Sequence, residues 1–213
     1  MDKNHFEQKH MEKSWKIRKN SYQQFTIENS IKKFYTFLKS KSVKGKLLDI
    51  GCGSGKNTVY FSKKRFQSLG IDFIKEAIRI SKKHAKDNSS TAKFMVKDIV
   101  TQTLNLNRFD VILDCGCLHH LRKQYWPKYK KNLLKVTKSG SYYYLHGFSV
   151  SSKKLGTCPQ NRNWVIRKGH YTHFFSVEEV KKFLGTNFKI LKMDEYKCLT
   201  GRFFVKVFYM QRK

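Results

Sequence analysis

The chain has 213 residues, a length that suits one domain able to bury most of its unfolded surface. Its 45 lysines and arginines against 15 aspartates and glutamates give a formal charge of +30, which indicates a polyanionic partner such as nucleic acid, a phospholipid surface or an acidic small substrate. No apolar run is long enough to cross a bilayer and the N-terminus lacks an apolar signal core, so we expect a soluble, cytoplasmic protein rather than a membrane-spanning one.

Residues 1–43 are expected to form a helical cover in front of a larger domain, residues 44–213. Apolar side chains recur on one helical face over residues 26–38, which predicts a helix packed on a sheet edge. The members of this face are Ile27, Ile31, Phe34, Tyr35 and Leu38. Upstream, residues 5–22 show a weak amphipathic pattern that fits either a lid over a bound ligand or a frayed tail.

A short apolar run ends in three glycines at alternate positions, Gly51, Gly53 and Gly55. Glycines adopt positive φ readily and let a ligand lie against bare backbone, and a helix expected over 56–64 offers its first amides to a carboxylate. The spacing excludes a Walker A loop, which needs four residues between its glycines and then Gly-Lys-Ser/Thr. It also excludes a dinucleotide fingerprint, whose third glycine comes one position later. The loop therefore predicts a cofactor cradle of another kind.

Four aspartates lie in or directly after the first four predicted strands. They are Asp49, Asp72, Asp98 and Asp114, with strands expected over 47–50, 67–73, 93–97 and 109–113. Asp72 comes about twenty residues after the glycines, where Rossmann-like folds bind ribose hydroxyls. Any one aspartate alone fits a helix cap or a turn residue equally well. Four in sequence beside a glycine loop favour a nucleoside site at the carboxyl edge of a parallel sheet.

The pattern Asp49-x-Gly-x-Gly-x-Gly55 resembles motif I of the class I S-adenosylmethionine (SAM)-dependent methyltransferases. The resemblance covers residues 44–213 and implies an α/β fold with a Rossmann-like seven-stranded sheet, mostly parallel with a C-terminal antiparallel hairpin, and helices on both faces. It implies SAM as the cofactor and an adenine-binding role for the acid after the third strand. The cofactor-binding residues that it implies are Asp49, Gly51, Gly53, Gly55, Asp72, Phe73, Asp98, Ile99 and Asp114. The run 55–61 after the glycines also looks like that of the tellurite-resistance and thiopurine methyltransferases, which act on small, soft acceptors.

Strand and helix patterns alternate through the rest of the chain, as a parallel α/β sheet requires. Further helices are expected over 74–84, 125–136 and 177–184, and further strands over 141–145, 188–193 and 202–210. Ser176 and Glu179 form a capping box that opens the last helix, and Gly185 ends it. The two trailing strands resemble the antiparallel hairpin that closes the methyltransferase sheet.

Two segments are expected to form the acceptor pocket, because ligands bind outside the carboxyl ends of parallel strands. The first, 115–126, contains His119 and His120, which are candidate catalytic bases for a hydroxyl or protonated amine; alternatively, one caps a turn and the other faces solvent. The second, 147–175, lacks periodicity and is interpreted as a long functional insertion, more mobile than the sheet. Its candidate substrate-binding residues are Trp164, Arg167, His170 and Tyr171.

The five cysteines are odd in number and are expected to be reduced thiols. Cys115 and Cys117 stand beside His119 and His120, but one intervening residue is too few for a structural zinc pair, so no metal is predicted.

The predicted function is in-line methyl transfer from SAM to a small-molecule acceptor, for which the protein mainly has to hold the acceptor close and aligned. Residues 114–117 match neither the Asn/Asp-Pro-Pro-Tyr/Phe motif of enzymes that methylate exocyclic amines nor the proline–cysteine pair of RNA cytosine C5 enzymes. Two alternatives stay open: an RNA methyltransferase that uses the basic surface, and a non-catalytic SAM-binding module. The excess of lysine over arginine also fits an A-rich coding sequence, so charge alone does not choose between them.

Overall fold

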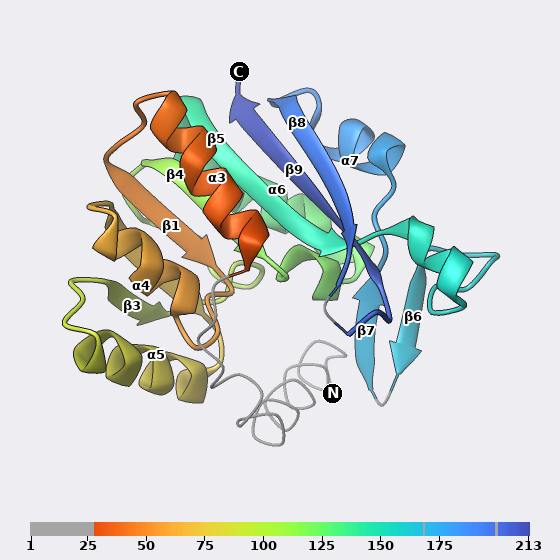
Figure 1. The fold of residues 1–213 in the computed structure, drawn as a ribbon, viewed down its shortest axis with the longest axis horizontal. Helices are drawn as coiled ribbons and strands as arrows, with labels where there is room; N and C mark the ends of the chain where they lie inside the picture. The colour runs from red at the N-terminus through yellow and green to blue at the C-terminus, as the bar shows by residue number, and fades with distance from the viewer. Residues whose placement is uncertain (1–27, 168, 199) are drawn as a thin grey trace.

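The computed structural model describes residues 28–213 except residues 168 and 199. Its centre is a seven-stranded sheet in the order β3-β2-β1-β4-β5-β9-β8 (Figure 1). The strands are β1 (Lys46–Ile50), β2 (Gln67–Asp72), β3 (Lys93–Val96), β4 (Phe109–Cys115), β5 (Thr137–Phe148), β8 (Phe188–Lys197) and β9 (Phe204–Arg212). The first five strands are parallel, and β9 runs antiparallel to both β5 and β8. The predicted fold class is confirmed, whereas the predicted lid, residues 5–22, lies outside the described residues.

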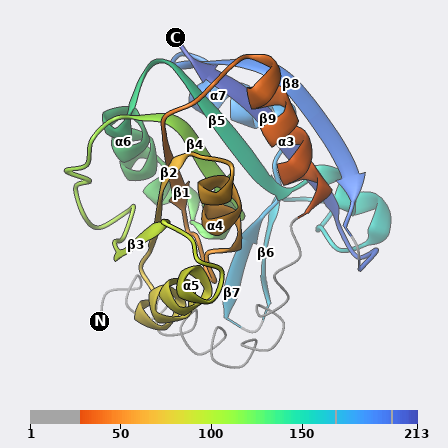
Figure 2. The same cartoon turned by 60° about the vertical axis from the view of Figure 1, so that its left-hand side comes forward.

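Helices cover both faces of the sheet. The α-helices are α3 (Asn29–Ser40), α4 (Lys56–Lys63), α5 (Lys75–Asp87), α6 (Trp126–Val136) and α7 (Val177–Leu184), and short 3-10 helices are η1 (Leu118–His120), η2 (Lys123–Tyr125) and η3 (Val150–Leu155). Side chains of α3 and α4 share one hydrophobic cluster, while those of α6 and α7 share another. Figure 2 shows α6 on one side of the strands and α3 and α4 on the other.

Helix α3 packs on inner strands of the sheet, which corrects the expectation that it lies at an edge. Its buried apolar stripe is Ile31, Phe34 and Leu38, each fully inaccessible to solvent. The Phe34 ring lies 4.9 Å from the rings of both Tyr144 on β5 and Tyr209 on β9. Burying each such side chain contributes about 1.5–3 kcal/mol. The helix therefore belongs to the main core rather than to a separate appendage.

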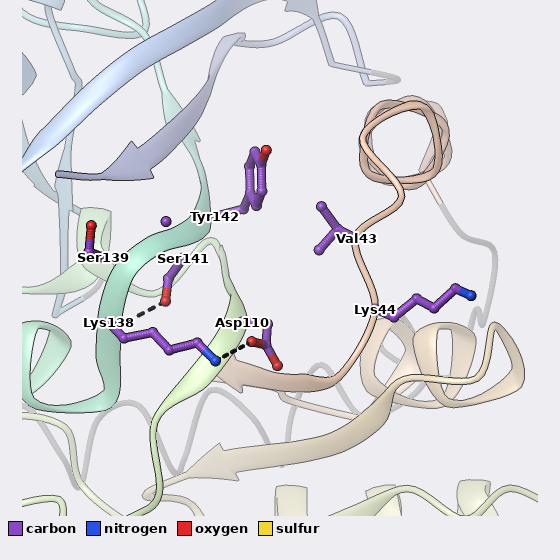
Figure 3. A pocket seen from close by; sticks show the side chains of 8 residues that line it. Val43, Lys44, Asp110, Lys138, Ser139, Ser141 and Tyr142 are labelled. Atoms are coloured by element: carbon purple, nitrogen blue, oxygen red, sulfur yellow. Dashed lines mark hydrogen bonds and ion pairs between the residues drawn. The ribbon is translucent and has the colours of Figure 1, made fainter.

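Strand β5 begins earlier than the sequence predicts, because a bulge interrupts its pattern. The pairing with β4 shifts register between Phe109 and Val111, and Gly140 adopts φ 84°. Ser141 Oγ donates to Phe109 O at 2.7 Å and accepts from Lys138 N at 3.0 Å, which secures the bulge. Figure 3 shows a shallow pocket beside it, at the amino ends of the strands. That edge is opposite the one where the glycine loop lies.

The segment 147–175 is not an irregular insertion. It contains η3 and a separate hairpin of β6 (Trp164–Arg167) and β7 (His170–His173). The signal for this hairpin is two short runs of aromatic and β-branched residues two positions apart, with Gly169 at φ 77° in the connection. Because both runs are only four residues long, their alternation is easily overlooked.

The predicted start of α7 is confirmed, but only half of the capping box forms. Ser176 Oγ accepts from Glu179 N at 3.1 Å. The Glu179 carboxylate turns instead to His173, at 2.5 Å, and to Lys123. Helix α7 thereby ties the β6–β7 hairpin to the segment after β4. No helix within the described residues combines the length and apolar character needed to cross a membrane.

Candidate cofactor and acceptor site

The glycine loop joins the end of β1 to the start of α4. The amides of Gly51 and Cys52 both donate to Ile71 O, at 2.8 and 3.0 Å, and so fasten the loop to β2. All three glycines of the motif have positive φ, 68°, 54° and 78° in chain order. A Cβ on Gly51 would lie 2.7 Å from Cys117 Cβ. The missing side chain therefore also lets the loop after β4 approach the glycine loop.

Asp72 ends β2 directly beside this loop. One carboxylate oxygen accepts from Gly53 N at 3.0 Å and the other from Ile74 N at 2.9 Å. Burial raises the pKa of Asp72 to about 6 against the hydrogen bonds that favour its ionised form, and 8% of the residue stays exposed. Each oxygen keeps a further lone pair for a hydroxyl donor. The arrangement fits the predicted contact with ribose.

Asp49 and Asp114 direct their carboxylates into the protein. Asp49 is 1% exposed and accepts from Thr58 Oγ1 at 2.7 Å, which anchors the start of α4. Asp114 is 0% exposed and accepts from the amides of Cys117 and Leu118 and from the Tyr129 hydroxyl. Burial raises their pKa values to about 7 and about 6 respectively. This revises the expectation that their side chains contact the cofactor: they shape the loops that line the site.

Asp98 lies after β3 and holds the following turn. Its carboxylate accepts from Val100 N and from Thr101 Oγ1, both at 2.7 Å. Ile99 beside it is buried, and Phe73 after β2 is half-buried. All three stand at the carboxyl ends of β2 and β3, where the sequence places them. Their contact with the cofactor stays a prediction.

The two candidate histidines contact each other and the β6–β7 hairpin. Nε2 of His119 lies 2.9 Å from Nε2 of His120. Nδ1 of His120 lies 3.0 Å from the carbonyl oxygen of Tyr171, a residue 51 positions later in the chain. A carbonyl only accepts, so His120 donates from Nδ1 and neutral His120 accepts at Nε2. Nε2 of His119 therefore donates the hydrogen bond to His120 Nε2. In neutral His119 the other ring nitrogen, Nδ1, then carries a lone pair and no proton.

His119 is held neutral by its surroundings. It is 5% exposed, its ring stacks on Phe148 at 4.8 Å, and its Nδ1 is buried without a hydrogen-bond partner. Burial lowers its pKa well below the usual value, and the neighbouring His120 lowers it further. The alternative in which one histidine faces solvent does not hold for His119.

The predicted acceptor residues lie on the hairpin, and the structure brings some of them to the histidines. Tyr171 is buried, stacks on Trp164 at 5.9 Å, and faces the guanidinium of Arg122 at 5.6 Å. Arg167 donates to Thr157 O at 3.1 Å and so secures the loop before β6. His170 is half-buried beside the connection of the hairpin. Sequence reasoning missed Arg122 because an isolated basic residue in a very basic chain gives no signal.

The comparisons with known proteins agree with this geometry. Residues 47–140 match the family described as methyltransferase domain. An uncharacterised methyltransferase of Schizosaccharomyces pombe is 25% identical over 138 residues, 64% of this chain and 90% of the relative. A ubiquinone biosynthesis O-methyltransferase of Pelagibacter ubique is 34% identical over 110 residues, 51% of this chain and 45% of the relative. The chain is a class I SAM-dependent methyltransferase.

Solved structures show the same fold. The 1,6-didemethyltoxoflavin-N1-methyltransferase of Burkholderia thailandensis, with 1,6-didemethyltoxoflavin and S-adenosylhomocysteine bound, has a TM-score of 0.75 and 15% identity over 96% of this chain and 88% of its own. TehB of Haemophilus influenzae has a TM-score of 0.69 and 16% identity over 92% of this chain and 66% of its own. These likenesses show the fold. As a member of the methyltransferase family matched over residues 47–140, the chain uses SAM as its cofactor, and Asp72 with the Gly51–Gly55 loop fits that role by position and chemistry.

A second polar cluster stands at the same edge of the sheet, on the α3 face. Cys115 and His146 are paired neighbours on β4 and β5, and Glu28 precedes α3. His146 Nε2 lies 3.0 Å from the Tyr196 hydroxyl and 3.3 Å from Glu28 Oε2. Burial lowers the pKa of His146, but Cys115, Glu28 and Tyr196 outweigh it and raise the pKa well above the usual value. The hydrogen bond to His146 leads the effects that lower the pKa of Glu28 to about 2.

Proposed function

We propose that this methyltransferase transfers the methyl group of SAM to a small-molecule acceptor held outside the carboxyl ends of β4 and β5. The observation that carries the proposal is the contact of His120 with Tyr171 O at 3.0 Å, which joins the segment after β4 to the β6–β7 hairpin. Strand β4 lies next to β1 in the sheet, and the segment after β4 borders the glycine loop that follows β1. Stacked aromatic rings, Trp164 on Tyr171, suit a planar or apolar acceptor of limited size.

Bound SAM supplies an electrophilic methyl group, and the chain supplies position. Asp72 and the glycine loop orient the nucleoside, while the hairpin and the 115–126 segment hold the acceptor in line with the methyl group. The stacked rings also favour the positive sulfonium of the methyl donor. The residues that would hold the acceptor are Trp164, Arg167, His170 and Tyr171.

The histidine pair is the proposed proton acceptor when the acceptor is a hydroxyl or a protonated amine. In this proposal the pair takes up one proton at His119 Nδ1, which has no hydrogen-bond partner among the described residues. Because burial depresses the pKa of His119, its ring is neutral at physiological pH, so its lone pair is not already protonated. His119→Gln should therefore lower kcat for such acceptors while leaving SAM affinity unchanged.

Known activities of relatives support a small acceptor. The Pelagibacter relative acts in ubiquinone biosynthesis, and a further relative in Mycobacteroides abscessus, 28% identical over 102 residues, methylates 2-heptyl-1-hydroxyquinolin-4(1H)-one. The quinolinone acceptor of the second relative carries a planar ring. We propose a planar, ring-containing hydroxyl or amine compound as the class to test first.

A transfer assay with SAM labelled in its methyl group tests the proposal without presuming the acceptor. Fractionated small metabolites, RNA and protein serve as separate acceptor pools, and Asp72→Ala serves as a variant defective in cofactor binding. We expect label in the small-metabolite pool. Label confined to RNA or protein would contradict the proposal.

The charge of +30 keeps RNA as the second candidate acceptor. An electrostatically bound polyanion loses affinity steeply as salt rises, because binding releases counterions. RNA methylation that falls with salt in parallel with RNA binding would establish this alternative. Salt-sensitive binding without methylation would show only nonspecific attraction to the basic surface.

A further inference from the structure

We propose that Cys115, His146 and Glu28 form a binding site for a zinc ion at the acceptor side of the fold. One donor atom from each residue, the thiol sulfur, a ring nitrogen and a carboxylate oxygen, lies within 4.8 Å of the other two. Among the described residues, this is the group of three or more histidine, cysteine, aspartate or glutamate side chains whose donor atoms lie that close together. The spacing of Cys115 and Cys117 excludes a zinc site that uses both thiols. The proposed site uses Cys115 with His146 and Glu28 instead.

The donor set selects the class of ion. Zinc in proteins is bound by cysteine sulfur, histidine nitrogen and carboxylate oxygen, usually in a tetrahedron. Magnesium and calcium require oxygen ligands throughout, so a mixed sulfur, nitrogen and oxygen set disfavours both. Three protein ligands also leave the fourth tetrahedral position open, as catalytic zinc sites do.

The framework around the three residues is rigid. Cys115 and His146 stand at paired positions on adjacent strands, so the sheet sets their separation. Cys117, two residues after Cys115, packs with the opposite hydrophobic cluster and lies against Gly51, so the two thiols cannot share one ion. A metal site on rigid strands needs little reorganisation to close around an ion.

Surrounding residues orient the proposed ligands. The Tyr196 hydroxyl contacts His146 Nε2 at 3.0 Å and also donates to Ser30 Oγ at 3.0 Å. Ser30 Oγ in turn reaches Glu28 Oε2 at 3.4 Å. Metal sites depend on such outer contacts, which fix ligand orientation and affect affinity. His146 Nδ1 is buried, and this nitrogen has no hydrogen-bond partner among the described residues.

The position gives the ion access to the acceptor side. Cys115 follows Asp114 at the carboxyl end of β4, and the next residues of this loop contact the glycine loop. Glu28 is the most accessible of the three ligands, with 37% of its side chain exposed, against 12% for His146. A water molecule, or an oxygen or sulfur atom of the acceptor, would complete the tetrahedron from that side.

Cobalt(II) titration of the full chain tests the site. Co²⁺ occupies zinc sites and produces a thiolate-to-metal absorption band when a cysteine binds it, and this spectrum is read without turnover. Metal-free protein, kept reduced with a phosphine, should develop the thiolate band with one equivalent of Co²⁺ and lose it when Zn²⁺ is added. The result is independent of the acceptor's identity, so failure here is distinguishable from failure of the proposed function.

Variants assign the ligands. Cys115→Ser should abolish the thiolate band, while the matched control Cys117→Ser should keep it. Glu28→Gln should weaken Co²⁺ binding about tenfold or more, as should Tyr196→Phe through ligand orientation. Circular dichroism of each variant checks that it is folded. Absence of the band in the unaltered protein, or its persistence in folded Cys115→Ser, would overturn the proposal.

Discussion

The cofactor side and the acceptor side of this methyltransferase are built in different ways. On the cofactor side, polar side chains hold backbone amides within or next to their own motif, as Asp72 holds Gly53 and Ile74. On the acceptor side, side chains from distant segments hold one another. His120 contacts β7, and His146 lies between Tyr196 and Glu28, whose sequence positions differ by 168.

The difference shows why the cofactor is easier to infer than the acceptor. A cofactor pocket made from one loop and the ends of adjacent strands depends on local spacing. The proposed acceptor site, made from the 115–126 segment and the β6–β7 hairpin, depends on how segments far apart in the sequence meet. The following predictions test whether the two sides are also separable in energy and in function.

Asp114 joins the two sides, so its loss should have the largest effect. Asp114→Ala leaves the amides of Cys117 and Leu118 and the Tyr129 hydroxyl without their buried acceptor and should lower the free energy of unfolding by about 3 kcal/mol or more. Tyr129→Phe removes a single hydroxyl and should cost about 1 kcal/mol. Urea unfolding measures both. Equal, small losses would show that the network around Asp114 does not hold the two sides together.

Asp72→Ala should act on the cofactor side alone. The variant removes the carboxylate that we assign to the ribose hydroxyls, so SAM affinity should fall about tenfold to a hundredfold, equivalent to about 1.5–3 kcal/mol. Calorimetry with SAM and S-adenosylhomocysteine measures the loss. Tyr171→Ala is the control from the acceptor side and should bind SAM normally. Unchanged affinity in Asp72→Ala would contradict the cofactor assignment.

Trp164→Ala and Tyr171→Ala should act on the acceptor side alone. Losing the stacked ring pair removes acceptor positioning, so we expect about a tenfold rise in KM for the acceptor or a fall in kcat, with SAM affinity unaffected. Steady-state kinetics with the acceptor found by the transfer assay measures the change. If these variants instead melt at lower temperature while the folded fraction keeps full activity, the hairpin is core packing and our acceptor assignment is wrong.

The last expected effect depends on pH and concerns the buried carboxyl of Asp49. Its pKa of about 7 lies above the ordinary 3.8, so the folded state holds this proton more tightly than the unfolded state does. The stability that this group contributes is full below pH 3.8 and is lost as pH rises towards 7. Asp49→Asn removes the titration and keeps an acceptor for Thr58.

The variant should therefore gain stability relative to the unaltered protein as pH rises from about 4 to about 7, with no further gain above that range. Urea unfolding across that range measures the difference. A difference that does not vary with pH would show that Asp49 is ionised throughout. Asp72 and Asp114, with pKa values of about 6, contribute slopes of the same sign in both proteins.

The sequence by itself determined the fold class, the glycine loop and the order of strands and helices. These follow from local rules: the spacing of Gly51, Gly53 and Gly55 requires positive φ, and the alternation of apolar runs sets the parallel sheet. It also placed Asp72 correctly at the end of β2, because a strand end is a local feature. It failed on β5 and on the β6–β7 hairpin, where a bulge at Gly140 and two very short strands conceal the period.

Only the tertiary structure decided which polar side chains face a ligand. Asp49, Asp72 and Asp114 look alike in the sequence, yet 8% of Asp72 stays exposed beside the glycine loop, against 1% of Asp49 and 0% of Asp114. Likewise, Cys115 meets His146 because β4 and β5 pair in that register, and it meets Glu28 because α3 packs across both strands. Such contacts depend on the relative placement of whole elements. Periodicity along the chain reports which face of an element is buried, but not what lies opposite that face.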